Sequence, residues 1–252
     1  MRTIAVINQK GGVGKSTTAQ AIGAGFIREG ASVLFVDLDP QCNLSYLMGA
    51  DITGLTGGNA LDVLQGNATI ADAIQKTSQG DIVAAAPSLA GADVVLTATG
   101  KEYRLREALE SLAGQYDYCL IDTPPALGVL TVNALTACNG CVIPAQADFL
   151  SLQGIGQLHK TIGTVKKYCN PNLKVFGIVL TRYNARAVIS REVTSMMEGT
   201  AAALQTQVYQ TRIRECTAIK EAQAMRQTIY DYAPKSNASL DYSALLQEIK
   251  KG

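Results

Sequence analysis

A glycine-rich loop with two lysines follows the first strand-like run of the chain, residues 2–8. The loop consists of Lys10, Gly11, Gly12, Val13, Gly14, Lys15, Ser16 and Thr17, and a helical pattern begins inside it. Glycines let backbone N–H groups converge on phosphate oxygens, and the N-terminus of the following helix adds a favourable dipole. We therefore expect Lys15 to reach the β- and γ-phosphates of a nucleotide, Ser16 to ligate Mg²⁺ and Thr17 to contact the α-phosphate.

The spacing of this loop departs slightly from the usual phosphate-loop pattern G-x-x-x-x-G-K-[ST]. Gln9 stands where the first glycine is expected, and the glycines have moved to positions 11 and 12. Strand, loop, Lys-Ser pair and helix still occur in the required order, which is the context that gives the motif its meaning. The sequence therefore predicts a nucleotide phosphate site at this loop.

Three aspartates follow two later strand-like runs, residues 32–37 and 117–122. Asp37 and Asp39 are two positions apart and so fall on the same side of an extended strand. Asp122 ends the second run, which is the expected position for a carboxylate that holds a Mg²⁺-bound water. Ligands of open α/β sheets bind at the carboxyl ends of the strands, so these carboxylates and the loop are expected to form one magnesium–nucleotide site.

Short apolar runs alternate with helical patterns along the whole chain. Candidate strands are 2–8, 32–37, 81–85, 117–122, 140–145 and 174–181, and candidate helices are roughly 15–29, 59–76, 99–113, 127–138, 150–168, 188–204 and 237–250. Nearly continuous apolar strands separated by helices predict an α/β fold with a mostly parallel sheet flanked by helices on both faces. The absence of a long linker or repeat predicts a single domain over 1–252, with no helix-turn-helix pattern ahead of Arg2.

With these motifs in place, the chain resembles the ParA/Soj/MinD family of deviant-Walker P-loop ATPases, and most closely its ParA/Soj partition branch. The resemblance rests on KGGVGKST (10–17), VDLDPQCN (36–43), LIDTPPALGVLTVNAL (120–135), LTRYNAR (180–186) and IRECTAIKEA (213–222). It implies ATP and Mg²⁺ as cofactors and an ATPase that dimerises when ATP binds. A lysine supplied in trans would then act on the partner's phosphates as an arginine finger does.

The resemblance also implies a role for individual residues. Lys10 would be the lysine that crosses to the partner subunit, and Lys15 would act in its own subunit. Asp39 would orient the attacking water, Asp37 would support it, and Asp122 would hold the Mg²⁺ shell. Arg182 falls where the family contacts adenine, and the chain has no guanine-reading N/T-K-x-D motif at the equivalent strand end, so ATP is expected over GTP.

Two segments differ from the family pattern. The glycine of D-x-D-P-Q-G-N is replaced by Cys42, which restricts the loop and brings a thiol near the site. The segment 213–222 lacks the proline that relatives carry beside adenine, and it lacks two arginines of their basic surface. Adenine packing and the basic surface are therefore expected to differ here.

Charge is distributed unevenly along a chain whose net charge is only +1. Residues 1–150 carry 8 basic and 14 acidic side chains, whereas residues 151–252 carry 14 basic and 7 acidic ones. Relatives bind non-specific double-stranded DNA with the corresponding basic region once the ATP dimer doubles the patch, and such phosphate contacts are salt-sensitive. The candidate DNA-binding residues are Arg186, Arg191, Arg212, Arg214 and Lys220. The competing interpretation is a set of solvated helix faces partly paired with glutamates.

The family implies a ParB-like centromere-binding partner and a cytoplasmic protein that associates with the nucleoid when ATP is bound. Two alternatives remain. A MinD-like or other positioning ATPase that does not act through DNA would share the site, although a membrane-acting one needs an amphipathic C-terminal anchor that residues 245–252 lack. An iron–sulfur reductase would need a bridging cysteine where the chain has Thr123, Pro124 and Pro125.

The six cysteines are sparse for the length of the chain, and no signal segment opens it, so reduced thiols and a reducing cytosol are expected. Cys138 and Cys141 are spaced like a redox or metal pair but stand alone, and we interpret them as structural. The uncharged stretch 123–147 is interrupted by prolines and polar residues. It therefore fits a buried helix followed by a buried strand better than a membrane span.

Overall fold

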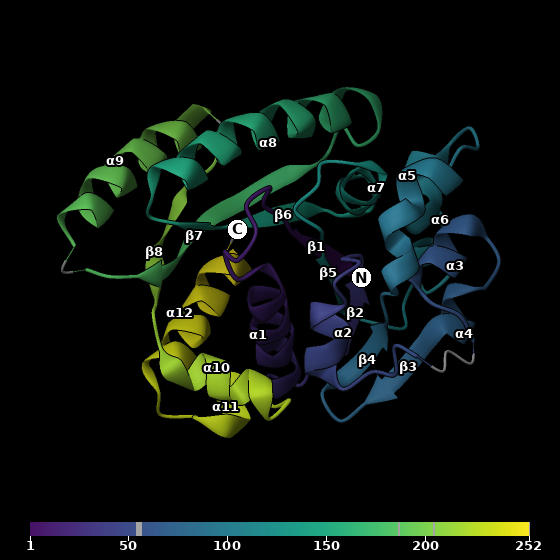
Figure 1. Cartoon of the computed structure of the whole chain (residues 1–252), viewed down its shortest axis with the longest axis horizontal. Coiled ribbons are helices and arrows are strands. Elements are labelled where there is room, and N and C mark those ends of the chain that lie inside the picture. The colour runs from purple at the N-terminus through teal and green to yellow at the C-terminus, as the bar shows by residue number, and fades with distance from the viewer. Residues whose placement is uncertain (54–56, 186, 204, 252) are drawn as a thin grey trace.

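The computed structural model describes residues 1–53, 57–185, 187–203 and 205–251. The strands within these residues form one eight-stranded sheet in the order β3-β4-β2-β5-β1-β6-β7-β8 (Figure 1). They are β1 (Arg2–Val6), β2 (Val33–Asp37), β3 (Ile74–Thr77), β4 (Gly80–Val83), β5 (Tyr118–Asp122), β6 (Gly140–Gln146), β7 (Lys174–Tyr183) and β8 (Val208–Arg214). Among the strands that the structure describes, β3–β4 is the one antiparallel pair, so the predicted mostly parallel sheet is confirmed.

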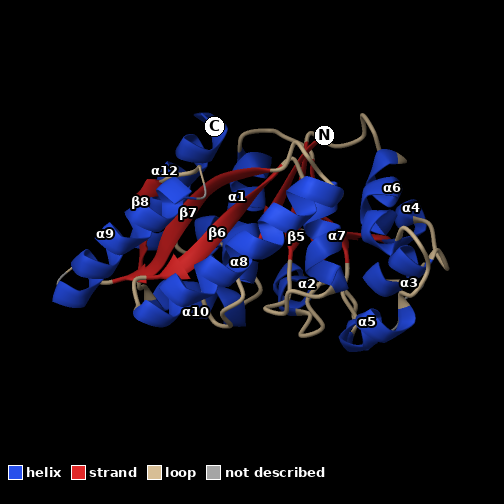
Figure 2. Cartoon of the chain, turned by 90° about the horizontal axis from the view of Figure 1, so that it is seen from above, coloured by secondary structure: helices blue, strands red, loops and turns tan. Residues whose placement is uncertain are grey.

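Helices cover both faces of the sheet, as the alternating pattern predicts (Figures 1 and 2). They are α1 (Lys15–Arg28), α2 (Asn43–Met48), α3 (Ala60–Gln65), α4 (Ile70–Ala73), α5 (Ala92–Val95), α6 (Arg104–Glu110), α7 (Val129–Ala137), α8 (Phe149–Tyr168), α9 (Val188–Ala203), α10 (Thr217–Ala224), α11 (Ile229–Tyr232) and α12 (Asn237–Lys251). One apolar core lies under α1, α11 and α12, and the other lies under α3 and α6 to α9.

The register of the central strands brings the candidate site together. Asp37 at the end of β2 is the direct partner of Asp122 at the end of β5, and Val6 at the end of β1 pairs with Asp122 from the other side. Parallel strands end at the same edge of a sheet, so the loops after β1, β2 and β5 leave from adjacent positions. Helix α1 packs closely here, because a Cβ on Gly23 would lie 2.2 Å from the ring of Phe35.

The predicted helix over 59–76 is wrong in its second half. Helix α3 ends at Gly66, whose φ of 79° lies in the left-handed region that favours glycine, and α4 contributes only one further turn. Residues 74–77 then form β3, which pairs antiparallel with β4. The apolar spacing of this segment resembles a helix, but the strand is decided by its pairing with β4, which local periodicity does not contain.

Strand β8 at the sheet edge is also absent from the sequence-based strands. Its outward N–H groups are satisfied by α12: Gln210 and Thr211 donate to the carboxylate of Glu248 at 2.8 Å each, and Arg214 N donates to Asp241 at 3.0 Å. Side chains therefore cap the edge that would otherwise offer free backbone donors to another chain. These carboxylates lie some thirty residues further along the chain, so β8 depends on tertiary contacts.

The uncharged stretch 123–147 forms α7 and β6, as predicted. Within the described ranges, no helix combines the length and apolar character needed to cross a membrane. All six cysteines are free thiols, and Cys138 and Cys141 are both buried, which agrees with their structural interpretation. Burial raises the pKa of the Cys138 thiol to about 12, so this thiol remains protonated at neutral pH.

Candidate active site

The loop between β1 and α1 has the backbone shape that its glycines predict. Gly12 and Gly14 have φ values of 74° and 85°, and α1 begins directly after Gly14. Lys15 in the first turn is 7% exposed, and its Nζ lies 3.4 Å from the carbonyl oxygen of Lys10. Burial lowers the pKa of Lys15, whereas the nearby carboxylates of Asp122 and Asp39 oppose this shift. A buried cation at a helix N-terminus is suited to phosphate.

Two adjoining hollows lie against this loop. The larger has a volume of about 580 Å³ and is lined by residues of the loop together with Asp39, Gln41, Asn43, Tyr46 and Pro125. The smaller, of about 160 Å³, is lined among others by Arg182, Glu215, Cys216, Ile219 and Tyr242. They share Gly12, Gly14, Thr17 and Gln223. The larger hollow, lined by the phosphate loop, could take the phosphates of a nucleotide, and the smaller hollow beside it could take the base.

Gln223 of α10 lies at the boundary between the two hollows. Its Nε2 donates a hydrogen bond of 2.7 Å to the hydroxyl of Thr17. The contact joins the phosphate loop to a helix more than two hundred residues further along the chain. Sequence reasoning missed Gln223, because no local motif surrounds it.

Asp122 is fully buried beside the loop and keeps one oxygen free. Its Oδ1 accepts a hydrogen bond from Thr123 N at 3.0 Å, and its buried Oδ2 has no partner among the described residues. Burial and the neighbouring Asp37 raise its pKa well above the usual range, while Ser16 and Lys15 pull it back. An unpartnered buried acceptor near the Ser16 hydroxyl fits the second shell of a Mg²⁺ ion, which would supply the missing positive charge.

Asp37 has a different environment, because both of its oxygens are already engaged. Oδ2 accepts from the backbone N and the hydroxyl of Ser45 at 2.8 and 2.7 Å, and Oδ1 accepts from Asp39 N at 3.0 Å. Burial raises the pKa of Asp37 to about 6, although the hydrogen bonds from Ser45 oppose the shift. Asp37 therefore shapes the loop after β2 and does not line the hollow. Sequence reasoning missed Ser45.

Asp39 reaches the larger hollow from this loop. It is 6% exposed, and its Oδ1 accepts from Gln41 N at 2.9 Å, which fixes the carboxylate against its own turn. Cys42, at the position where relatives carry glycine, has a φ of 54° in the left-handed region. A non-glycine residue is strained in that conformation. Burial raises the pKa of this thiol to about 11, so Cys42 adds no anion to the site at neutral pH.

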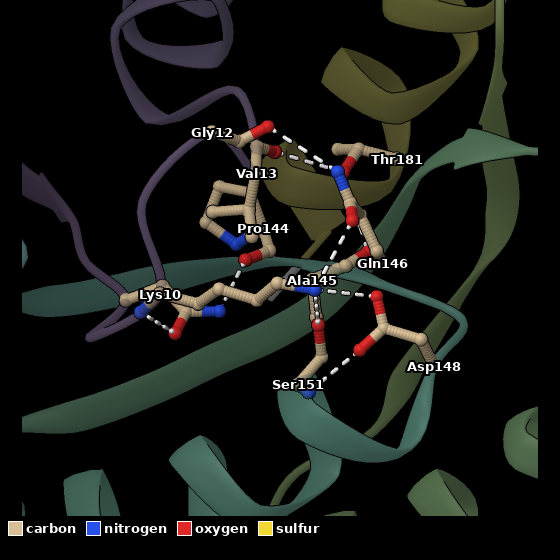
Figure 3. Close-up of polar contacts among 10 residues, drawn as sticks. Lys10, Gly12, Val13, Pro144, Ala145, Gln146, Asp148, Ser151 and Thr181 are labelled. Atoms are coloured by element: carbon tan, nitrogen blue, oxygen red, sulfur yellow. Dashed lines mark hydrogen bonds and ion pairs between the residues drawn. The ribbon is translucent and has the colours of Figure 1, made fainter.

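Lys10 does not point into the hollow of its own subunit. Figure 3 shows its ammonium among three acceptors between the end of β6 and the first turn of α8: Gln146 Oε1 at 3.2 Å, Asp148 Oδ2 at 2.5 Å and Ser151 Oγ at 3.4 Å. Burial raises the pKa of Asp148, but hydrogen bonds from Lys10 and Ser151 outweigh it, so the pKa lies below its ordinary value. Asp148 also accepts from Ser151 N at 2.8 Å and caps α8. Its role with Lys10 was not predicted.

The loop that carries Lys10 is tied to the neighbouring strands (Figure 3). The hydroxyl of Thr181 donates to the carbonyl oxygen of Val13 at 2.8 Å, and Gln146 Nε2 donates to the carbonyl oxygen of Gly12 at 3.3 Å. These contacts hold the loop from β6 and β7. Sequence alone places Thr181 next to Arg182 but does not show what its hydroxyl contacts.

The residue expected to contact adenine and one of those expected to contact DNA form ion pairs within the subunit. Arg182, with a φ of 48°, borders the smaller hollow and pairs with Glu215 at 3.1 Å. Arg214 is 2.6 Å from the buried carboxylate of Asp241.

The remaining candidates have different surroundings. Arg212 donates to the carbonyl oxygen of Tyr209, and Lys220 is exposed beside the smaller hollow. Arg186 lies outside the described residues. The backbone of Arg191 belongs to α9, but its side chain lies outside what the structure describes. Their assignment to a DNA surface stays a prediction.

Comparison with known proteins identifies the family of the chain. The family model described as "AAA domain" matches residues 1–175. The chain is 37% identical to the sporulation initiation inhibitor protein Soj of Bacillus subtilis, over 98% of both chains, and 37% identical to the chromosome partitioning protein ParA of Myxococcus xanthus, over 99% of this chain and 88% of that one. A solved structure titled cobyrinic acid a,c-diamide synthase from Mycobacterium smegmatis, with bound ADP and magnesium, is 35% identical with a TM-score of 0.84, and the match covers 98% of this chain and 93% of that one. The chain belongs to the ParA/Soj group of deviant-Walker P-loop ATPases.

Proposed function

We propose that this chain is a partition ATPase that dimerises on ATP, binds duplex DNA without sequence preference and is stimulated by a centromere-binding partner. As a member of its family it is a magnesium-dependent ATPase. The observation that carries the proposal is the division of the two lysines: Lys15 faces the hollow of its own subunit, and Lys10 is held outside it. A site built in this way lacks one cation until a second subunit supplies it.

Within one subunit, the residues divide the work of phosphoryl transfer. Backbone N–H groups of residues 11–17 cradle the phosphates, and Lys15 neutralises charge on the β- and γ-phosphates. Asp39 orients the attacking water from the edge of the larger hollow, while Asp37 holds the Asp39 loop in place by accepting hydrogen bonds from Asp39 N and Ser45 N. Arg182 borders the base.

The metal is held by groups of the same subunit. Ser16 would ligate Mg²⁺ through its hydroxyl, and Asp122 would orient the water molecules around the ion. When bound, the ion neutralises charge on the phosphate oxygens. The unpartnered Oδ2 of Asp122 supports this assignment, because a buried carboxylate oxygen without a partner is otherwise costly.

Lys10 completes the site from the partner subunit. Its ammonium must leave Asp148 to do so, and the free energy lost there is recovered on the developing negative charge of the γ-phosphate. Hydrolysis is therefore coupled to dimerisation. The names of the relatives ParA and Soj support a role in DNA partition.

DNA binding by the ATP dimer rests on the basic second half of the chain. The dimer would present two copies of this surface and bind duplex phosphates in a salt-sensitive manner. Exposed Lys220 remains available within it. Such a dimer would associate with the nucleoid and would leave it after hydrolysis.

The proposal is tested by Lys10→Ala, with Lys76→Ala as an exposed-lysine control on β3. Sedimentation with ATP, ADP or no nucleotide, with and without plasmid DNA, measures dimer formation and DNA retention, and phosphate release measures hydrolysis. Lys10→Ala is expected to bind ATP normally but to hydrolyse it at least about a hundredfold more slowly, which corresponds to an increase of about 2.7 kcal/mol in the activation free energy. Wild-type hydrolysis per subunit that does not depend on protein concentration would contradict the dimer mechanism.

A further inference from the structure

We propose that a second ligand site, for a small multiply charged anion, lies at the opposite edge of the sheet from the nucleotide loop. An open hollow of about 760 Å³ occupies the amino ends of β1, β6 and β7. Arg2 at its rim begins β1, and roughly 13 Å of extended strand separates Arg2 from Val6, beyond which the nucleotide loop starts. The hollow is thus distinct from the ATPase site, and the inference goes beyond the proposed function.

The charge of this hollow has one sign. Its lining includes Arg2, Arg106 and Lys174, and no aspartate or glutamate among the described residues lines it. An adjoining hollow of about 420 Å³ shares Lys174 with it and adds Lys166, and its lining within the described ranges is again free of acidic residues. By contrast, the hollows at the nucleotide loop contain Asp39 and Glu215. Cations that converge on a concave surface without carboxylates create a positive potential that attracts anions.

These cations keep donors for a ligand. Arg106 uses its Nε for Glu110 at 3.1 Å, which leaves its terminal nitrogens, and Lys174 is exposed. The Arg2 guanidinium lies 4.7 Å over the ring of Phe176 and makes a long contact of 3.5 Å to the carbonyl oxygen of Ile249. Phe176 therefore holds Arg2 by its flat face and leaves the edge of the guanidinium open for a carboxylate or phosphate.

A buried hydroxyl supplies a second, independent observation. Thr136 near the end of α7 lines the same hollow and is 2% exposed, and its Oγ1 has no hydrogen-bond partner among the described residues. Buried polar groups are almost always satisfied, so an unpartnered one at the wall of a hollow points to a ligand atom. This oxygen is enclosed, so an anion oxygen can accept from the hydroxyl when the Thr136 side chain turns toward the hollow, where the cations at the rim neutralise the charge of the anion.

The shape favours a small molecule over a nucleic acid. The volume of about 760 Å³ falls in the range typical of metabolite sites. Phosphate and carboxylate groups share the chemistry that arginine and lysine recognise. The ligand is therefore a compact phosphate or carboxylate with more than one negative charge.

Isothermal titration of the full chain tests the site, with saturating MgADP present to fill the nucleotide loop. Inorganic phosphate is the probe in one arm and tricarballylate in the other, which separates phosphate from carboxylate recognition. Lys174→Gln and Arg106→Gln are each expected to raise the Kd of at least one probe about five- to tenfold, as loss of a charge-assisted hydrogen bond does. Lys160→Gln, an exposed lysine of α8 outside the lining, is the matched control and should bind normally.

Thr136→Val separates a binding role from a structural one. The substitution removes the hydroxyl and keeps the shape of the side chain, so it should raise the Kd of the probe about fivefold without lowering the melting temperature. Several results would overturn the proposal. One is the absence of saturable binding of either probe, and another is an equal loss of probe affinity in Lys160→Gln. A third is duplex DNA binding that requires Lys174 while neither small anion binds.

Discussion

The ammonium of Lys10 lies 2.5 Å from Oδ2 of Asp148 within the same subunit, and Asp148 is also the N-cap of α8. One carboxylate thus holds the lysine proposed to act in trans and starts the helix beside it. The two roles can be separated, because serine is a good N-cap but carries no charge. The pair is partly exposed, with side-chain exposures of 26% and 38%, so its strength is modest.

Asp148→Ser is expected to favour the ATP dimer. A half-exposed ion pair contributes about 0.5–1 kcal/mol, and each dimer would release two of them. The dimer dissociation constant should therefore fall about five- to thirtyfold. Analytical ultracentrifugation with non-hydrolysable ATP measures it. Asp148→Ala should favour dimerisation equally, but it should lose about 1 kcal/mol of folding free energy because the N-cap of α8 is removed. An unchanged dissociation constant in both variants would show that the Lys10–Asp148 ion pair does not oppose dimerisation.

Two neighbouring aspartates are expected to respond to asparagine with opposite sign. Asp122→Asn removes a buried carboxyl group whose charged form is destabilised by burial and whose Oδ2 has no partner among the described residues. The nucleotide-free protein should therefore gain about 1–2 kcal/mol of unfolding free energy at neutral pH, while losing the stabilisation that Mg²⁺ adds with ADP. Asp37→Asn breaks a fully satisfied set of hydrogen bonds and should lose about 2 kcal/mol or more. Urea unfolding with and without MgADP measures both, and equal effects would contradict the assigned roles.

Stability of the nucleotide-free protein should depend on pH through the same carboxylates. The pKa of Asp37 is raised from 3.8 to about 6 by burial, so the folded protein holds more protons than the unfolded chain between these values. Its contribution to stability is therefore full below about pH 3.8 and is lost as pH rises through about 6. Asp122 acts in the same direction. Urea unfolding free energies measured from pH 5 to 7 should fall less steeply in Asp122→Asn than in the wild type.

Cys216 reports on the smaller hollow, which it lines. It is partly exposed, as is Cys169, whereas the other four cysteines are buried. Alkylation by iodoacetamide, followed by mass spectrometry, should modify these two thiols first. MgATP should slow modification of Cys216 at least about fivefold and leave Cys169 unchanged. Equal alkylation rates at Cys216 with and without MgATP would show that adenine does not bind in the smaller hollow.

Arg214 and Lys220 are expected to differ although both were predicted to contact DNA. Arg214→Ala leaves the buried carboxylate of Asp241 unpaired, so the melting temperature should fall measurably. Lys220→Ala removes an exposed charge, so DNA retention in ATP should weaken while the melting temperature stays constant. A nitrocellulose filter assay at two salt concentrations measures retention. A loss confined to Arg214→Ala would move the DNA surface to β8.

Some features follow from local sequence because their physical cause is local. The glycines at 12 and 14 permit the loop, and the charge-free stretch 123–147 contains a complete buried helix and strand. Positions of Lys15, Asp39 and Asp122 at one sheet edge follow from their places after parallel strands. By contrast, β3 depends on pairing with β4, and β8 depends on carboxylates of α12, so periodicity in either segment is insufficient.

The sequence by itself therefore determined the family, the fold class and the identity of the phosphate loop, because these depend on short motifs and on the alternation of apolar strands with helices along the chain. Only the tertiary structure decided what each charged group faces. It showed that Lys10 rests on Asp148, that Asp37 is saturated while Asp122 keeps an open oxygen, and that Arg214 is held by Asp241. Such pairings join residues 8 to 138 positions apart, and burial sets their electrostatic effect. Neither the pairing of distant residues nor their burial can be read from residue type and spacing.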